Sequence, residues 1–244
     1  MPSIFTTFEQ YDPKAEIGLR LLTPLTPSDM VRSVFGAYAC TIMDDAQLYP
    51  NCVAKLVYRH YGVAVHQALH QALNWEAPAF APKLHGCSSK PGIDARVYIM
   101  EYLRPPSYDT PGWLTLARVN QDMVAKKLDL IYPLLNEIVD RLANLELVHG
   151  DLRPNNLMIK MSDRIQIAEP VEIKVVDFEW ADKVGTARYP QSLNKHIGYP
   201  GEPGGLIGPK DDCYMIDKWR MGVLDYVEKL HRTGTVGNNA WSPF

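Results

Sequence analysis

Apolar and polar positions change their rhythm along the chain, from short apolar runs in the first half to a helical repeat in the second. Runs rich in β-branched, aromatic and other apolar residues predict strands over Gly18–Leu22, Val34–Met43, Cys52–Tyr58 and Arg96–Leu103. Between the last two runs, Val65, Leu69 and Leu73 recur at every fourth position, which predicts a helix over Tyr58–Trp75. The first half is therefore expected to be built mainly on a β-sheet.

The second half opens with the three- and four-residue spacing of an amphipathic helix. Between Gln121 and Val148 a single apolar stripe contains Val124, Leu128, Ile131, Leu135, Ile138, Leu142 and Leu145. Pro133 falls inside this stripe and removes a helical N–H donor, so we expect a kink or two shorter helices.

The remaining elements complete a mixed chain. Short strands are predicted over Leu157–Lys160 and Val171–Phe178, and a last helix runs from about Asp212 to His231. Strands first and helices later indicate an α+β fold with two lobes, which meet near Glu101–Ser107. The first 15 residues follow neither pattern and are expected to form a strap or tail.

Size and composition exclude several classes of protein. A chain of 244 residues with 46% apolar and 22% charged residues fits one large domain or two small lobes. The net charge of −3 gives no electrostatic reason to expect a nucleic-acid or anionic-membrane partner. No apolar run reaches the length of about 18 residues typical of a transmembrane helix, and the first residues lack the features of a secretory signal. We therefore expect a soluble, cytoplasmic protein.

Two short segments carry residues suited to phosphoryl transfer, namely His149–Asn156 (HGDLRPNN) and Val175–Trp180 (VVDFEW). That reaction needs a carboxylate beside the attacking hydroxyl, ligands for the metal on the nucleotide phosphates, and positive charge near the transferred group. Asp151 and Asn156 lie in a predicted loop, and Asp177 ends an apolar strand. Oxygen ligands from Asn156 and Asp177 suit magnesium.

These motifs, in this order, resemble those of the protein-kinase-like superfamily. His-Gly-Asp-Leu-Arg-x-x-Asn is similar to the catalytic loop His-Arg-Asp-Leu-Lys-x-x-Asn, and Val-Asp-Phe-Glu is similar to the magnesium-binding Asp-Phe-Gly. The resemblance implies that Asp151 is the catalytic base and that Arg153 faces the γ-phosphate of ATP. It implies that Asn156 and Asp177 are magnesium ligands. It also places Asp212 where a helix-starting aspartate anchors the catalytic loop.

Upstream segments resemble the nucleotide-binding part of the same superfamily. The tripeptide VAK, which ends at Lys55, resembles the strand whose lysine grips ATP. The tetrapeptide MEYL resembles the gatekeeper and hinge, so that Met100 would be the gatekeeper. Backbone groups of Glu101 and Leu103 would then bind adenine.

The resemblance covers most of the chain and implies a bilobal protein-kinase-like fold. It predicts a β-rich N-lobe over residues 16–103 and a shortened helical C-lobe over residues 104–244, with the catalytic loop at 149–156 and the metal strand at 171–178. The stretches DFEWADKVGTARYP and DDCYMID further resemble kinase-like proteins abundant in mushroom-forming (basidiomycete) fungi.

The sequence departs from the usual kinase pattern in its nucleotide-binding half. No Gly-x-Gly-x-x-Gly lies between the first two strands, where Leu22–Arg32 instead contains Pro24 and Pro27. Prolines lack the N–H donors that a phosphate cradle uses. The predicted helix over Tyr58–Trp75 has no acidic residue to pair with the lysine, and the first carboxylate after it is Glu76.

Milder departures concern the catalytic half. Gly150 stands where the family has the arginine that responds to activation-loop phosphorylation, which implies that this control is absent. Gly150 and Glu179 also occur at these places in small-molecule kinases of the choline and aminoglycoside type. His66 and His70 have the spacing of a zinc-protease helix, but Gln67 replaces the general-base glutamate, so we expect a helix face without a metal.

Three interpretations follow from these patterns. The first is an ATP- and magnesium-dependent phosphotransferase that resembles a protein kinase and acts on an unidentified hydroxyl acceptor. The second is a small-molecule kinase with the same ATP chemistry. The third is a pseudokinase, a non-catalytic binding module, which the missing glycine loop and the missing helix glutamate favour. Intact Asp151, Asn156 and Asp177 favour catalysis.

Overall fold

The computed structural model describes residues 18–24, 37–43, 48–58, 60–71, 78–87, 96–162 and 166–233. By its contacts the chain divides into a sheet unit, Met1–Tyr61 with Pro82–Leu103, and a helical unit, Gly62–Ala81 with Arg104–Phe244. The chain therefore passes from one unit to the other more than once. The predicted strap over the first 15 residues lies outside the described residues.

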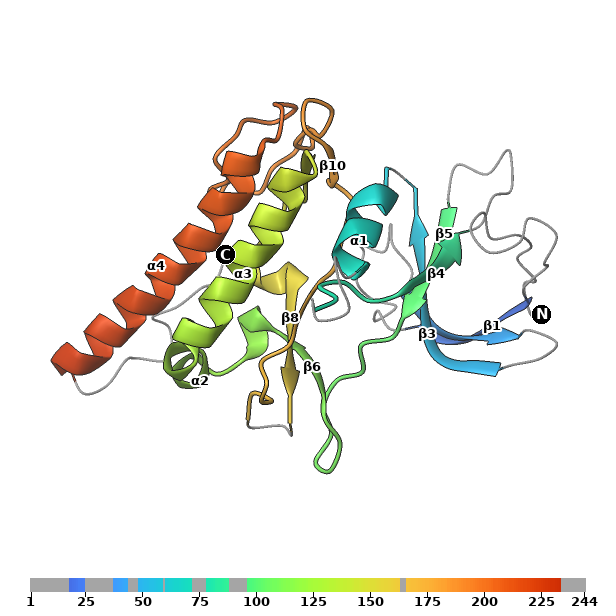
Figure 1. Cartoon of the computed structure of the whole chain (residues 1–244), viewed down its shortest axis with the longest axis horizontal. Helices are drawn as coiled ribbons and strands as arrows, with labels where there is room; N and C mark the ends of the chain where they lie inside the picture. The colour runs from blue at the N-terminus through green and yellow to red at the C-terminus, as the bar shows by residue number, and fades with distance from the viewer. Residues whose placement is uncertain are drawn as a thin grey trace. The chain divides into compact units, whose positions relative to one another are not determined.

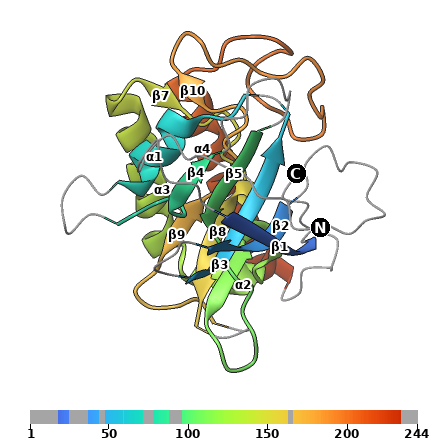
Figure 2. The ribbon, with the colours of Figure 1, turned by 90° about the vertical axis from the view of Figure 1, so that its right-hand side faces the viewer.

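The sheet unit is built on a five-stranded antiparallel sheet, whose strands are visible in Figure 2. In spatial order its strands are β1 (Gly18–Pro24), β2 (Ala37–Met43), β3 (Leu48–Val57), β5 (Arg96–Glu101) and β4 (Leu84–Cys87). β3 and β5 are interior strands, and Lys55 pairs with Tyr98 between them. Ala54, Val57 and Ile99 are at most 2% exposed, so apolar burial holds these two strands together.

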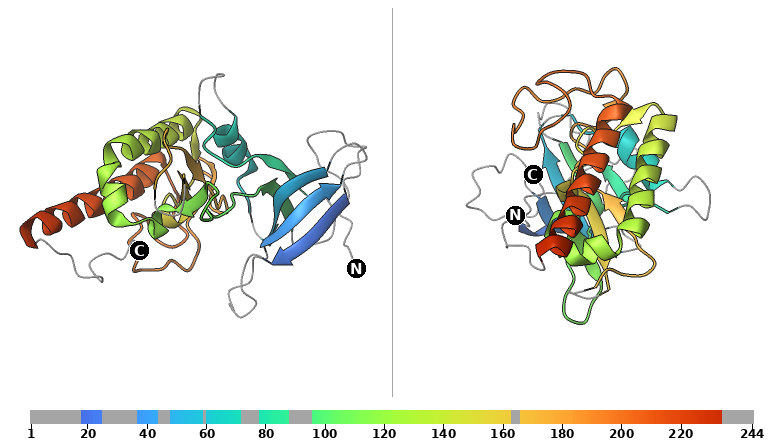
Figure 3. Two further views of the ribbon diagram at one scale, coloured as in Figure 1. Left: turned by 90° about the horizontal axis from the view of Figure 1, so that it is seen from below. Right: turned by 90° about the vertical axis from the view of Figure 1, so that its left-hand side faces the viewer.

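Among the residues that the structure describes, four α-helices belong to the helical unit, and Figures 1 and 3 show α3 and α4 side by side. Their bounds are α1 (Val63–His70), α2 (Gln121–Lys126), α3 (Leu128–Asn144) and α4 (Pro209–Thr233). The apolar stripe of α3 faces inward, because Ile131, Leu135, Ile138 and Leu142 are at most 1% exposed. Burial of this stripe supplies much of the unit's core.

The predicted long helix is divided, but not at its proline. The break lies at Lys127, between α2 and α3, whereas Pro133 lies inside α3. Pro133 comes just after the first turn, so its missing N–H costs only one helical bond. The stripe also ends earlier than predicted, because α3 stops at Asn144 and Leu145 is 46% exposed.

Other predicted bounds were also too wide. The helix predicted over Tyr58–Trp75 is helical only over Val63–His70, and residues 72–77 lie outside the described part. The strand predicted over Val171–Phe178 is a strand only over Ile173–Val175. The N–H of the next residue, Val176, donates to Asn156 O, beyond the end of β8 (Leu157–Met161).

Short strands complete the helical unit. A three-stranded sheet has the order β6 (Gly112–Thr115), β8 (Leu157–Met161) and β9 (Ile173–Val175), and a small pair joins β10 (Asp182–Lys183) to β7 (Leu147–Val148). Two 3₁₀ turns, η1 (Leu116–Arg118) and η2 (Pro154–Asn156), link these strands to the neighbouring segments.

The α+β prediction, with a β-rich N-terminal part and a helical C-terminal part, is confirmed by this arrangement. Among the described residues, no helix combines the length and the apolar character that a membrane crossing requires.

Candidate active site

The loop after β7 is fixed by the first turn of α4. The Asp212 carboxylate accepts hydrogen bonds from two successive backbone N–H groups, those of His149 at 2.7 Å and Gly150 at 2.8 Å. Asp212 is 1% exposed, and burial raises its pKa to about 7 although the two N–H donors act in the opposite direction. The anchoring role that the resemblance implied for Asp212 is confirmed.

Gly150 has a local structural reason to be glycine. Its φ is +81°, and a Cβ there would lie 2.7 Å from Ile207 Cδ1. Ile207 is 1% exposed within a cluster that also contains Val148 and Tyr189. The departure from the protein-kinase pattern at this position therefore coincides with a backbone conformation that disfavours any side chain.

Asp151 is the carboxylate of the loop and contacts three side chains, those of Asn156, Tyr199 and Arg153. It is 4% exposed, and its Oδ2 accepts from Asn156 Nδ2 at 2.8 Å. Its Oδ1 accepts from the Tyr199 hydroxyl at 2.7 Å and lies 3.1 Å from Arg153 Nε. Burial raises the pKa of Asp151 to about 6, against the opposing effects of Arg153, Tyr199 and Asn156, while the Asp177 charge raises it further. Such a carboxyl ionises near neutral pH, which suits a general base.

Asn156 and Asp177 meet at one end of the β8–β9 hairpin. Leu157 pairs with Val175, and the next N–H, that of Val176, donates to Asn156 O at 2.9 Å. Asp177 then adopts a left-handed backbone with φ of 70°, a conformation that costs energy for a residue other than glycine and is common at functional sites. The structure thus brings together Asp151, Asn156 and Asp177 within the helical unit.

The Asn156 amide is oriented for a cation. Its Nδ2 donates both to Asp151 O at 2.9 Å and to the Asp151 carboxylate, which directs the amide oxygen away from Asp151. An amide oxygen and the Asp177 carboxylate are ligands of the kind that magnesium prefers. These residues therefore fit the metal that the resemblance implies.

Phe178 packs between two histidines and secures the segment that carries Asp177. The rings of His66 and Phe178 stack with centroids 4.3 Å apart, and the His149 ring meets Phe178 edge-on at 5.2 Å. His149 Nδ1 accepts the N–H of Asp151 at 3.2 Å, so this histidine orients the loop. The expected helix face at His66 is thus a packing surface, and His70 Nδ1 lies 3.3 Å from Ala81 O.

The predicted nucleotide-binding residues belong to the sheet unit. Lys55 lies on β3 and is partly buried, and Met100 is an 8% exposed residue of β5. Glu101 N–H donates to Lys83 O at 2.8 Å, and Leu103 is 8% exposed. The structure places Asp151, Arg153, Asn156 and Asp177 in the other unit. Glu76, the candidate partner of Lys55, lies outside the described residues, as does the segment 25–36 between the first two strands.

Two residues of this site were missed at the level of sequence. The Tyr199 hydroxyl donates a hydrogen bond to the Asp151 carboxylate. Lys218 of α4 donates to the carbonyls of Ile197 and Gly198 at 2.7 and 3.1 Å. Tyr199 follows Gly198 in an irregular Gly- and Pro-rich stretch, which has no periodicity from which its partner could be deduced. The cluster of Tyr199 with other aromatic rings is likewise a tertiary feature.

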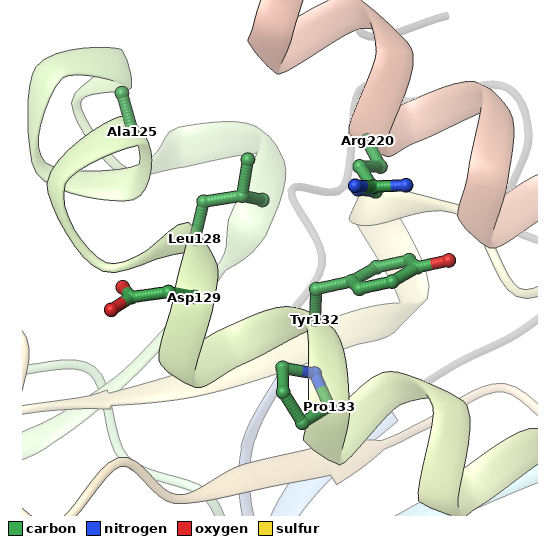
Figure 4. Close-up of a pocket in the computed structure, with 6 residues that line it drawn as sticks. All are labelled: Ala125, Leu128, Asp129, Tyr132, Pro133 and Arg220. Atoms are coloured by element: carbon green, nitrogen blue, oxygen red, sulfur yellow. The ribbon is translucent and has the colours of Figure 1, made fainter.

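A separate surface pocket of about 360 Å³ lies between α2, α3 and α4 (Figure 4). Its lining residues are Ala125, Leu128, Asp129, Tyr132, Pro133 and Arg220. The guanidinium of Arg220 lies 4.5 Å from the Tyr132 ring centre, and Tyr132 donates to Asp217 at 2.7 Å. Figure 4 shows the Asp129 carboxylate directed away from Arg220. These polar groups do not converge, unlike those around Asp151.

Comparisons with known proteins find similarity at the level of structure and none at the level of sequence families. No family model matches the sequence, and no curated protein matches it. Among solved structures, the chain is similar to PK-1, the kinase of Cydia pomonella granulovirus, with 17% sequence identity and a TM-score of 0.48. The alignment covers 85% of this chain and 67% of the viral chain.

Proposed function

We propose that this chain is a protein-kinase-like phosphotransferase that transfers the γ-phosphate of ATP to a hydroxyl group. The observation that carries the proposal is the buried Asp151 carboxylate, held by Asn156 on a loop whose backbone is anchored to Asp212. A turn or helix cap would not require this combination, whereas a positioned proton acceptor beside a metal site does.

Each candidate site residue of the helical unit has a role in this proposal. Asp151 accepts the proton of the attacking hydroxyl. Arg153, whose side chain is 23% exposed and paired with Asp151, supplies positive charge to the transferred phosphoryl group. Asn156 and Asp177 would hold magnesium, which neutralises charge on the nucleotide phosphates when bound.

The sheet unit would supply the nucleotide contacts. Lys55 would bind the α- and β-phosphates, Met100 would border the adenine, and Glu101 and Leu103 would bind its edge through backbone groups. Because the N–H of Glu101 already donates to Lys83 O, its carbonyl would be the adenine-binding group. The acceptor is a protein hydroxyl or a small-molecule hydroxyl, and both use the same base.

Variants at Asp151 and Asp177 separate nucleotide binding from catalysis. Ligand binding to the folded state raises stability by about 2.7 kcal/mol at a concentration 100-fold above Kd. We expect MgATP to raise the Tm of the wild type and of Asp151→Asn. Asp177→Ala should lose the magnesium-dependent part of this rise. Asp225→Ala and Asp225→Asn, at an exposed aspartate of α4, are the matched controls.

Turnover decides between the enzyme and the pseudokinase. ATP consumption that Asp151→Asn abolishes, with binding retained, would support phosphoryl transfer. Binding without consumption in the wild type would instead establish a nucleotide-binding module. If MgATP did not raise Tm and was not consumed, both the phosphotransferase and the nucleotide-binding module would be excluded.

A further inference from the structure

The Tyr199 hydroxyl lies where an acceptor hydroxyl would have to lie. A general base must be within about 2.6–3.2 Å of the oxygen whose proton it removes. Tyr199 Oη donates to Asp151 Oδ1 at 2.7 Å, so this phenol already meets that requirement. Arg153 Nε lies 3.1 Å from the same carboxylate oxygen, which brings the predicted phosphoryl-binding cation to the same place.

The loop that carries Tyr199 is held firmly against Asp151. Lys218 donates from α4 to the carbonyls of Ile197 and Gly198, the residues that directly precede the tyrosine. The Tyr199 ring packs against Trp180 and Tyr189, with centroids 5.2 and 5.8 Å away. A hydroxyl that is already fixed in this way loses little further conformational freedom when it reacts, and this is the condition for fast intramolecular transfer.

We propose that Tyr199 is a self-modification site, the phosphoryl acceptor within the same chain as Asp151. This proposal rests on the proposed function and names the first acceptor of that reaction. The phenolic oxygen forms a bond to the γ-phosphorus of ATP while the bond from that phosphorus to the β,γ-bridging oxygen breaks. ADP leaves, and the phenolic proton passes to Asp151 and then to solvent.

The electrostatics of the site support a neutral acceptor and a changed product. Burial and the Asp151 charge both raise the pKa of Tyr199, so the phenol keeps its proton until a base removes it. A phosphate on Tyr199 would place negative charge beside the Asp151 carboxylate. Like charges at this distance repel, so phosphorylation would displace Tyr199 and uncover the base for a second acceptor.

The experiment follows phosphate incorporation into the full chain. Purified protein, treated first with a phosphatase that is then removed, is incubated with MgATP and mapped by peptide mass spectrometry. We expect one phosphoryl group on Tyr199, at a rate per molecule that does not depend on protein concentration. Tyr199→Phe and Asp151→Asn should lose this modification, and Tyr108→Phe, at a tyrosine that is 84% exposed, should keep it.

Two further measurements separate the hydroxyl from the fold. Tyr199→Phe keeps the ring that packs on Trp180, and an unchanged Tm within the MgATP-free samples would show that it folds. Without nucleotide, proton NMR of the wild type should show a slowly exchanging hydroxyl signal that Tyr199→Phe lacks and Asp151→Asn shifts. Mixed with catalytic amounts of wild type, Asp151→Asn should remain unmodified because transfer is within one chain.

The outcomes distinguish this inference from the proposed function. Modification of Tyr199 that is first order in protein supports both. ATP consumption with Tyr199 unmodified, or with phosphate only on other residues, overturns the inference and leaves the proposed function standing. Modification of Tyr199 in the Asp151→Asn chain by wild type overturns transfer within one chain. Absence of both MgATP binding and ATP consumption overturns the two together.

Discussion

Gly150 provides a test of how tightly the catalytic loop is built. Its φ is +81°, and an added Cβ would lie 2.7 Å from Ile207 Cδ1 and 3.3 Å from Trp180 Cβ. Ile207 is 1% exposed, so it can move aside only by disturbing its neighbours. We therefore expect Gly150→Ala to destabilise the fold through both backbone strain and overpacking.

Gly185 is a matched control that isolates the first of these effects. Its φ is +83°, and nothing lies within 4 Å of an added Cβ. A left-handed non-glycine residue costs roughly 1–2 kcal/mol, which the lower entropy of the unfolded chain offsets by about 0.4–1 kcal/mol. We expect Gly185→Ala to cost about 0.5–1 kcal/mol. Gly150→Ala adds overpacking of about 1–3 kcal/mol, for a total of about 1.5–4 kcal/mol.

Urea unfolding of the two variants measures the difference. If the dependence of the free energy on urea is unchanged, the shift of the midpoint reports stability directly. ATP turnover should also fall in Gly150→Ala and not in Gly185→Ala, because the Gly150 N–H donates one of the two hydrogen bonds that anchor the loop to Asp212. Equal losses of stability in the two variants would show that the loop yields to a methyl group, contrary to this argument.

Three further predictions concern charged groups of the helical unit. Because the pKa of Asp151 is raised from 3.8 to about 6, ATP turnover should rise as the pH increases through about 6. The contribution of Asp151 to the stability of the fold should fall as the pH rises from 3.8 to about 6. A turnover that stays constant below pH 6 would contradict this prediction. Asn156→Asp places a second carboxylate beside Asp151 and should destabilise the chain more at pH 8 than at pH 5 in thermal unfolding. Arg141→Met removes the donor to Pro78 O and should cost about 2 kcal/mol in urea unfolding, against about 0.5 kcal/mol for the exposed partner variant Glu137→Gln.

Secondary structure was predictable where one local pattern dominates. The strand over Leu157–Lys160 is confirmed, because its residues alternate between buried and half-buried positions. β4 and β6 were not predicted, because each spans only four residues and contains a glycine, which weakens the local strand preference. β4 is stabilised by its pairing with β5, and β6 by its pairing with β8, and a local sequence pattern does not reveal such partners.

The candidate site was predictable only as far as its motif extends. Asp151, Asn156 and Asp177 were recognised from their order along the chain, and the structure groups them in one unit. Tyr199 was not, because its contact with Asp151 depends on the path of a loop that α4 holds in place through Lys218. Contacts of this kind join residues far apart in sequence and follow from packing, so no periodicity announces them.

The early segment of residues 62–81 limits how this protein can be divided. The N–H of Gly62 donates to Phe178 O, and the N–H of Val175 donates to Phe80 O, so this segment completes the backbone pairing on both sides of Asp177. A fragment cut after the sheet unit would contain the whole catalytic loop and yet leave both pairings unmade. The smallest fragment that preserves this site must therefore include residues 62–81 as well as the segment that contains the catalytic loop and Asp177. A chimera with a single crossover between these two stretches would separate parts that pair with each other.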